Sequence, residues 1–233
     1  MRNAVLIPLI LVGIEAGAAE VKIRELRLSG GVTPETDEPE GTDRVGATSA
    51  SISFDGDGAL DYGPRGGITL YESFGSLGRY GGFMLGFGFS HSEQEGDAAH
   101  QSNFSPTPIT YDGPIKRWVN VFDLHLGWAY ALSDKLHVEV LPFVGYGSMR
   151  VQDTIAFGGG VSRDDHGTSD GPYWEGGLTL GLYYTFANGA QLGANGGWLV
   201  SHGRASIGYS DGSLVYEIDQ SGPVGNITLG FRF

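Results

Sequence analysis

From about residue 80 onward, apolar residues alternate with small or polar ones, which is the period-two signature of β-strands with two different faces. The alternation fills residues 80–91, 117–132, 136–152, 173–186, 191–200 and 226–233. In the second of these segments one face consists of Phe122, Leu124, Leu126, Trp128 and Tyr130. These segments predict an all-β protein with strands much longer than the usual five or six residues.

The face opposite the apolar one indicates which side of the sheet looks inward. A soluble barrel would turn a face rich in Lys, Glu and Thr toward water, but here that face is largely glycine with scattered polar groups. Glycine accounts for 40 of the 233 residues, about 17% against a usual value near 7%. A glycine-rich face fits the crowded interior of a narrow barrel, with the aliphatic and aromatic face toward lipid.

The first third of the chain has a weaker pattern. Residues 21–32 and 67–74 show only partial apolar faces, and residues 48–54 fit either another strand or the flank of a long loop hairpin. Counting strands from the C-terminus, with both ends on the periplasmic side, gives eight; ten is the alternative. We therefore predict a closed, antiparallel, up-and-down transmembrane β-barrel.

The connections between the predicted strands are of two kinds. Residues 133–135 and 187–189 predict tight hairpin turns, the second with Gly189 in a left-handed conformation. The links at about 33–64, 92–116, 153–171 and 203–221 are long, as expected of extracellular loops. Their net charges are −7, −3, −3 and −2, so they hold the acidity of a chain whose net charge is −13. An acidic rim argues against nucleic acid as a partner, since phosphate binding needs basic clusters.

The N-terminal segment predicts secretion. A basic start at Arg2, the apolar run 4–12 and small residues before Ala18 and Ala19 form a signal peptide, which divides the chain into residues 1–19 and a barrel domain at 20–233. No other stretch has the roughly 18 apolar residues that a membrane helix needs. Cysteine is absent, which excludes disulfides and thiolate metal sites.

The segment Ile227-Thr228-Leu229-Gly230-Phe231-Arg232-Phe233 resembles the terminal strand of outer-membrane proteins, which ends in Phe after alternating apolar residues. The resemblance is closest to small barrels of the OmpA transmembrane domain, OmpX and neisserial opacity type. It implies location in the outer membrane of a Gram-negative envelope. It also implies that the barrel assembly machinery recognises Leu229, Phe231 and Phe233.

Seven charged or titratable residues fall on the glycine-rich face and are candidates for the barrel interior. They could line a proton or ion path, or form a network of ion pairs that replaces water in a narrow bore; we favour the network. The alternation also places Tyr183 opposite Gly193, as a ring that fills the space beside a glycine. The seven candidates are Arg117, Asp123, His125, His137, Glu139, Glu175 and Arg232.

Two motifs suggest chemistry outside the bore. His100 and Ser102 resemble the His-x-Ser arrangement of outer-membrane phospholipases and lipid A deacylases, in which His is the base and Ser the nucleophile. Asp55, Asp57 and Asp61 have the acid spacing of a cation loop but lack the Glu that an EF-hand needs at its twelfth position. For both motifs we favour a solvated loop, and we expect no cofactor.

These observations predict a non-enzymatic envelope protein with a structural or surface-interaction role carried by acidic loops. The expected partners are outer-membrane lipid and divalent cations at the loops. The first alternative is a narrow porin-like channel for ions or small solutes. The second is a lipid-acting enzyme.

Overall fold

The computed structural model describes residues 23–34, 40–45, 48–55, 60–74, 82–102, 109–157, 165–208 and 212–233. The predicted signal peptide at 1–19 lies outside these ranges and stays a prediction. Across the described residues, no helix is long and apolar enough to cross a membrane. The described strands are β1 (Ile23–Thr33), β2 (Glu40–Val45), β3 (Thr48–Asp55), β4 (Gly63–Phe74), β5 (Gly82–Ser102), β6 (Ile109–Ala131), β7 (Leu136–Phe157), β8 (Asp165–Thr185), β9 (Ala190–Gly208) and β10 (Gly212–Arg232).

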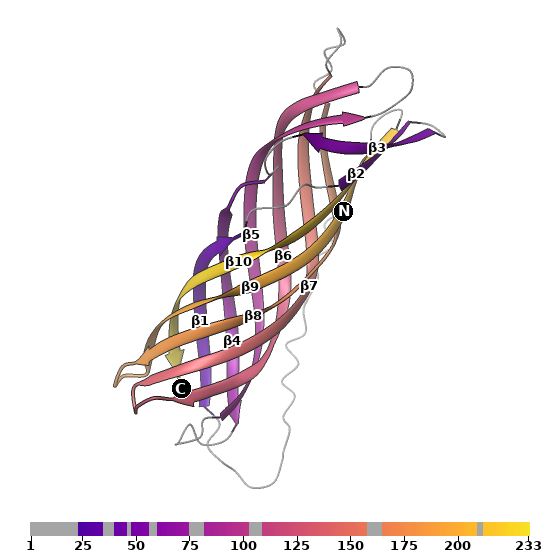
Figure 1. Ribbon diagram of the computed structural model, residues 1–233. Coiled ribbons are helices and arrows are strands. Elements are labelled where there is room, and N and C mark those ends of the chain that lie inside the picture. Colours follow the sequence, from indigo (N-terminus) through magenta and orange to yellow (C-terminus); the bar gives the residue numbers. More distant parts are fainter. Residues whose placement is uncertain are drawn as a thin grey trace, which may run out of the picture.

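Eight of these strands form a closed antiparallel ring in the order β1, β4, β5, β6, β7, β8, β9 and β10 (Figure 1). The ring closes where β1 pairs with β10, for example Leu28 with Leu229. The predicted fold class and the count of eight strands are therefore confirmed. The end with the tight turns, drawn at the bottom of Figure 1, is called the lower end below.

The hairpin β2–β3 lies at the upper end of the ring and is built from the first long link. β2 pairs with β10, and β3 pairs with β5 between Ile52–Asp55 and Ala99–Ser102. β1 ends at Thr33 and β4 begins at Gly63, both at a lower level. The hairpin thus occupies their place in the wall at the upper end. Of the two interpretations of residues 48–54, the loop hairpin is the observed one.

The strands are offset from one another around the ring. The cross-strand register leads from Asp219 of β10 through His202, Trp174, Tyr146, Phe122, Phe89, Ile68 and Leu28 to Leu229, again on β10. One circuit therefore displaces the register by ten residues, and this displacement accounts for the strong tilt of the strands in Figure 1.

An apolar belt surrounds the lower part of the barrel. Phe87, Phe122, Leu180 and Leu229 are among its exposed residues, whereas their sequence neighbours of opposite parity point inward. The alternation predicted this division of the two faces, and it is confirmed. The predicted tight turn is also present, because Gly189 has φ 84° and its N–H donates to the carbonyl of Phe186 at 3.0 Å.

The long links differ from the prediction, because much of their length is strand. β5 extends to Ser102, β7 to Phe157 and β9 to Gly208. Above the belt the alternation continues with its polarity reversed. On β7, for example, Met149 and Val151 point inward whereas Arg150 points outward. An apolar interior and a polar exterior are the stable arrangement for a barrel section that is surrounded by water.

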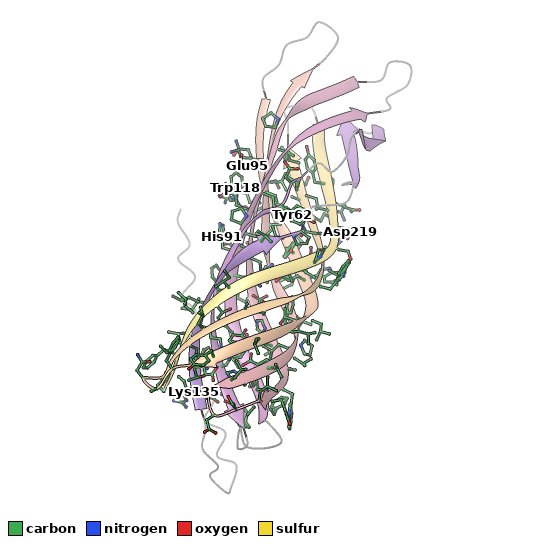
Figure 2. The ribbon with its side chains drawn as sticks, turned by 60° about the vertical axis from the view of Figure 1, so that its left-hand side comes forward. Tyr62, His91, Glu95, Trp118, Lys135 and Asp219 are labelled. Atoms are coloured by element: carbon green, nitrogen blue, oxygen red, sulfur yellow. The ribbon has the colours of Figure 1, made fainter. Side chains whose placement is uncertain are left out.

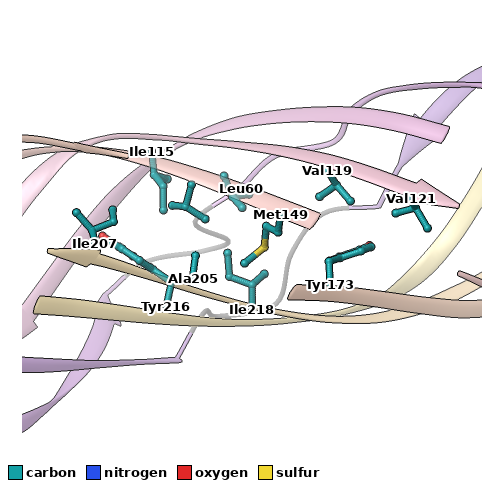
Figure 3. Packing of buried hydrophobic residues seen from close by; sticks show 11 residues of the cluster. Leu60, Ile115, Val119, Val121, Met149, Tyr173, Ala205, Ile207, Tyr216 and Ile218 are labelled. Carbon is teal, nitrogen blue, oxygen red and sulfur yellow. The ribbon is translucent and has the colours of Figure 1, made fainter. Parts of the chain in front are cut away.

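The upper part of the barrel consequently has a hydrophobic core of its own. Its interior residues pack together from five long strands and from Leu60, which enters from the link between β3 and β4 (Figure 3). Leu60 is fully buried. The cluster comprises Leu60, Ile115, Val119, Val121, Met149, Val151, Tyr173, Ala205, Ile207, Tyr216 and Ile218.

Candidate functional site: the closed lumen

A lower ion layer crosses the bore near the tight turns. Arg27 of β1 donates to both carboxylate oxygens of Glu139 on β7, from Nη1 at 2.6 Å and from Nη2 at 2.5 Å. Its Nε also donates to Glu25 at 3.1 Å. Arg232 donates to Glu25 from Nε at 2.8 Å, and His137 lies 2.9 Å from Glu139. The layer thus ties β1, β7 and β10 together through the bore.

Two tyrosine rings complete this layer around the Arg27 guanidinium. Its Cζ lies 4.5 Å from the ring centroid of Tyr71 and 4.1 Å from that of Tyr183. Tyr183 stacks in turn on His137, with 5.4 Å between the centroids. Such contacts favour a desolvated cation, so Arg27 is held by both charge and aromatic faces.

An upper ion layer lies further along the bore. Arg65 of β4 forms a bidentate pair with Glu175 of β8, one of whose bonds measures 2.8 Å. Arg65 Nη2 also donates to Ser90 at 2.9 Å, and the Ser90 hydroxyl donates to Asp123 at 2.9 Å. The Tyr173 hydroxyl donates to Glu175 at 3.1 Å. β4 and β8 lie on opposite sides of the eight-stranded ring, as do β1 and β7, so each bidentate pair spans the bore.

Between the two layers lies a cavity of about 70 Å³. That volume accommodates a few water molecules but is far below the several hundred cubic ångströms of a typical ligand pocket. Asp123 Oδ1 and His125 Nδ1 are buried at its wall and have no hydrogen-bond partner among the described residues. Other polar lining residues are Ser29, Thr69, Thr179, Asn195, Asn226 and Thr228.

Above the upper layer, the ends of the first long link are fastened inside the barrel mouth. Gln94 donates to the carbonyl of Pro34 at 2.8 Å and to that of Asp61 at 2.9 Å, and Gln220 also donates to Pro34. Arg117 donates to the side-chain oxygens of both glutamines. This arrangement, called the latch below, holds Leu60 in the upper core.

The structure places the seven predicted interior residues in different settings. Glu139 and His137 contact each other, whereas Asp123 and Glu175 gather around Arg65. Arg232 pairs with Glu25. Arg117 has glutamine partners instead of a carboxylate, and its Nε and Nη1 are unpartnered within the described part of the chain. His125 lies at the cavity wall, with 5.6 Å between its ring centroid and that of Phe143.

The sequence analysis missed the cations that hold the carboxylates, Arg27 and Arg65, together with Glu25. A signal was present in β1, because Glu25 and Arg27 alternate with Leu26 and Leu28 and therefore share the inner face. For Arg65 the sequence carries no comparable signal, since glycine and proline surround it at the start of β4.

The other predicted site residues lie away from the bore interior or outside the described atoms. His100 and Ser102 are on the upper extension of β5, opposite Tyr111 and Ile109, and the structure describes only their backbone. Asp55 ends β3, and Asp57 lies outside the described residues. Asp61 is exposed, and its N–H donates to the carbonyl of Glu95 at 3.1 Å. The described residues contain no group of three potential metal-ligating side chains.

The residues proposed as an assembly signal lie on the lower exterior of β10. Leu229, Phe231 and Phe233 are all exposed within the apolar belt. Phe233 is also joined to β1, because its N–H donates to the carbonyl of Arg24 at 2.9 Å.

A closed antiparallel ring with an exposed apolar belt and a polar, filled bore is the architecture of outer-membrane β-barrels. No protein-family model and no curated protein matches the chain. Among solved structures, it is similar to the outer-membrane protease OmpT of Escherichia coli, with a TM-score of 0.44 and 9% identity over 90% of this chain and 97% of that chain. For OprG of Pseudomonas aeruginosa the TM-score is 0.41 and the identity is 14%, over 90% of this chain and 95% of that chain. For Ail of Yersinia pestis, in complex with the heparin analogue sucrose octasulfate, the TM-score is 0.31 and the identity is 12%, over 90% of this chain and 99% of that chain.

Proposed function

We propose that this protein is a non-enzymatic outer-membrane barrel whose bore is closed and whose upper, acidic exterior makes contact with lipid, ions or another surface. In this proposal the barrel is a rigid support, and the contact is made by the residues that its extended strands present outside the membrane.

The observation that carries the proposal is the succession of three barriers in the bore. The lower and upper ion layers each span it between opposite strands, and the core that contains Leu60 fills it above them. A permeating ion would have to separate buried charge pairs, and an unpaired charge in a low-dielectric interior is costly. Closure therefore favours a structural or surface role over transport.

The upper exterior supports the second half of the proposal. Carboxylates that stay exposed although each is paired with a basic side chain of a neighbouring strand project from the strand sections above the belt, namely Glu95, Asp170, Glu217 and Asp219. Because hydrogen-bonded strands hold these groups, they are presented at fixed spacings, unlike charges on free loops. Fixed acidic groups suit divalent cations and surfaces that carry them.

A narrow channel is the second candidate function, and the cavity between the ion layers is the observation that favours it. The cavity is polar and large enough for water. If one layer rearranged, this space would become part of a hydrated path.

Single-channel recording in planar bilayers tests closure. We expect no steady current from the unmodified protein, and stable cation-selective openings would replace this proposal with the channel. Hydrolysis assays on phospholipid and lipid A test the enzyme alternative. An activity that His100→Ala and Ser102→Ala both abolish would overturn the non-enzymatic assignment.

A further inference from the structure

Two carboxyl groups of the upper ion layer meet beside Gly145. The register pairs Gly145 of β7 with Asp123 of β6 on one side and with Glu175 of β8 on the other. A Cβ at Gly145 would lie 2.4 Å from Asp123 Oδ1 and 3.1 Å from Glu175 Cγ. The carboxyl-bearing side chains of both neighbouring strands therefore share the space that the glycine leaves open.

One guanidinium serves both acidic groups. Arg65 forms its bidentate pair with Glu175, and the Tyr173 hydroxyl donates to the same carboxylate at 3.1 Å. Arg65 Nη2 lies 3.9 Å from Asp123 Oδ2, which is too far for a hydrogen bond. Asp123 Oδ2 accepts from the neutral Ser90 hydroxyl, whereas Oδ1 has no partner among the described residues. A charged Asp123 would thus be a buried anion without a cation of its own, which is costly.

The other charged groups of the described bore do not supply that cation. In the lower layer, Arg27 and Arg232 are engaged by carboxylates of that layer. Arg117 lies on the same strand as Asp123, but it donates to the two glutamines of the latch. His125 shares the wall of the cavity with two guanidinium groups, which repel a charged imidazolium. The remaining titratable groups at the cavity are the tyrosines whose rings flank Arg27, Tyr71 and Tyr183.

The acidic pair lies within the barrel, away from both openings. On β6, Asp123 lies between Trp118, which Figure 2 shows in the upper half of the barrel, and the lower turn that contains Lys135. Asp123 is 7% exposed and Glu175 is 1% exposed. Bulk water therefore does not stabilise a second negative charge beside Glu175.

We infer that Asp123 is a proton-binding site of the closed bore and holds its proton at neutral pH, while Glu175 stays ionised. Close carboxyl pairs share a proton in this way because two like charges repel each other. With Asp123 neutral, the guanidinium of Arg65 faces a single carboxylate. The inference deepens the closed bore of the proposed function by naming the proton as a ligand of the upper layer.

The same proton accounts for the two buried polar atoms that lack a partner at this cavity within the described part of the chain. Protonated Asp123 Oδ1 is a hydrogen-bond donor, and the Nδ1 atom of a neutral His125 is able to accept. The cavity of about 70 Å³ has room for water that joins them. A charged Asp123 would leave this pair of atoms without such a match in charge.

The bound proton makes the stability of the barrel depend on pH. In the unfolded chain an aspartate is ionised at neutral pH, so unfolding releases the proton of Asp123. The free energy of unfolding therefore falls as pH rises, because the native state binds more protons than the unfolded chain. Loss of the proton also places a second anion beside Arg65. The upper layer is thus a closure that weakens at alkaline pH.

Infrared spectroscopy of the folded barrel in lipid vesicles tests the site, because a protonated carboxyl group absorbs apart from carboxylates. We expect a protonated carboxyl band at neutral pH that shifts with ¹³C-labelled aspartate and not with labelled glutamate. Asp123→Asn should remove the band, and Asp170→Asn on the exterior should leave it unchanged. Glu175→Gln should also remove it, since Asp123 then has Arg65 to itself and ionises.

Several outcomes would overturn the inference. One is the absence of the band from the unmodified protein, and another is a shift with labelled glutamate instead. Persistence of the band in Glu175→Gln would show that burial alone holds the proton, and would overturn the role of the carboxyl pair. Heat-modifiable gel mobility confirms that each variant is folded, and the labelled, unmodified protein decides the question if one is not.

Urea unfolding gives a second measurement. The midpoint for the unmodified protein should fall more steeply from neutral to alkaline pH than the midpoint for Asp123→Asn, which has no proton to release. Equal falls in the two proteins would contradict a bound proton. Conductance does not enter either readout, so this inference and the closure of the bore can fail separately.

Discussion

Arg27 and Glu139 join opposite walls of the barrel, because their strands, β1 and β7, stand four positions apart in the ring of eight. The pair holds the ring across its diameter in addition to the hydrogen bonds between neighbouring strands. Changing one partner leaves a buried charge unpaired.

We therefore expect Arg27→Met to lower the free energy of unfolding by about 3–5 kcal/mol, the usual cost of breaking a buried pair. Urea unfolding in lipid vesicles, followed by tryptophan fluorescence, measures the change. Arg24→Met on the exterior of the same strand is the control, with an expected loss below about 1 kcal/mol. A loss as small as this in Arg27→Met would show that the lower layer contributes little to stability.

Leu60 gives a test of the upper core. Leu60→Ala removes a fully buried side chain from the upper core, and the expected loss is about 2–5 kcal/mol. The two ion layers below it stay intact, so planar bilayers should still show no steady current. An open channel in this variant would identify the upper core as the main barrier and would contradict the role given to the ion layers.

The glycines opposite Tyr183 differ from those on the exterior. Tyr183 pairs with Gly193, as the alternation predicted, and a Cβ at Gly193 would collide with the tyrosine ring. Gly193→Ala should cost about 1–3 kcal/mol through overpacking. At Gly30 a Cβ meets nothing within 4 Å, so Gly30→Ala should be neutral or slightly stabilising. Equal effects of the two changes in the same unfolding assay would show that the ring moves aside.

Phe233 tests the resemblance to terminal strands of outer-membrane proteins. Phe233→Ala should lower the yield of heat-modifiable, membrane-inserted protein, because the assembly machinery is expected to recognise this residue. Ile227→Ala is the control, since Ile227 lies on the same exposed face of β10 and is 65% exposed. If both variants insert equally well, Phe233 is only one of the lipid-facing residues.

The pair of Arg150 and Asp170 predicts a pH dependence. Hydrogen bonds from Arg150 lower the pKa of Asp170 below its ordinary value of 3.8. A lowered folded-state pKa contributes stability above the ordinary value, and this contribution is lost as pH falls through the folded value. An NMR titration of the Asp170 carboxyl carbon should therefore have its midpoint below 3.8, and Arg150→Gln should return it to the ordinary range. An unchanged midpoint in the variant would mean that the pair does not persist in solution.

Much of the fold could be predicted from alternation, since lipid outside and a narrow bore inside impose opposite requirements on successive residues. The height at which each strand ends could not be predicted in this way. On β7 the period of two continues past Tyr146, but the apolar positions change from the outer face to the inner face at Met149. A change of face looks like the end of a strand when apolar residues are assumed to stay on the lipid side.

The partners within the bore could be predicted only in part. Which residues face inward follows from the alternation along each strand, and this alternation placed Asp123, Glu139 and Glu175 on the inner face. The choice of Arg27 for Glu139 and of Arg65 for Glu175 depends on the ten-residue offset around the ring. That offset arises from strand tilt and closure, which no local segment of the sequence records.

The hairpin β2–β3 affects both how readily the first long link accepts insertions and how readily proteases cleave it. Because β2 is bonded to β10 and β3 to β5, the first long link contributes to the wall and leaves no free edge between them. Unpaired strand edges invite both association with other chains and access by proteases, which bind extended backbone. The paired part of this link should resist surface proteolysis and tolerate few insertions.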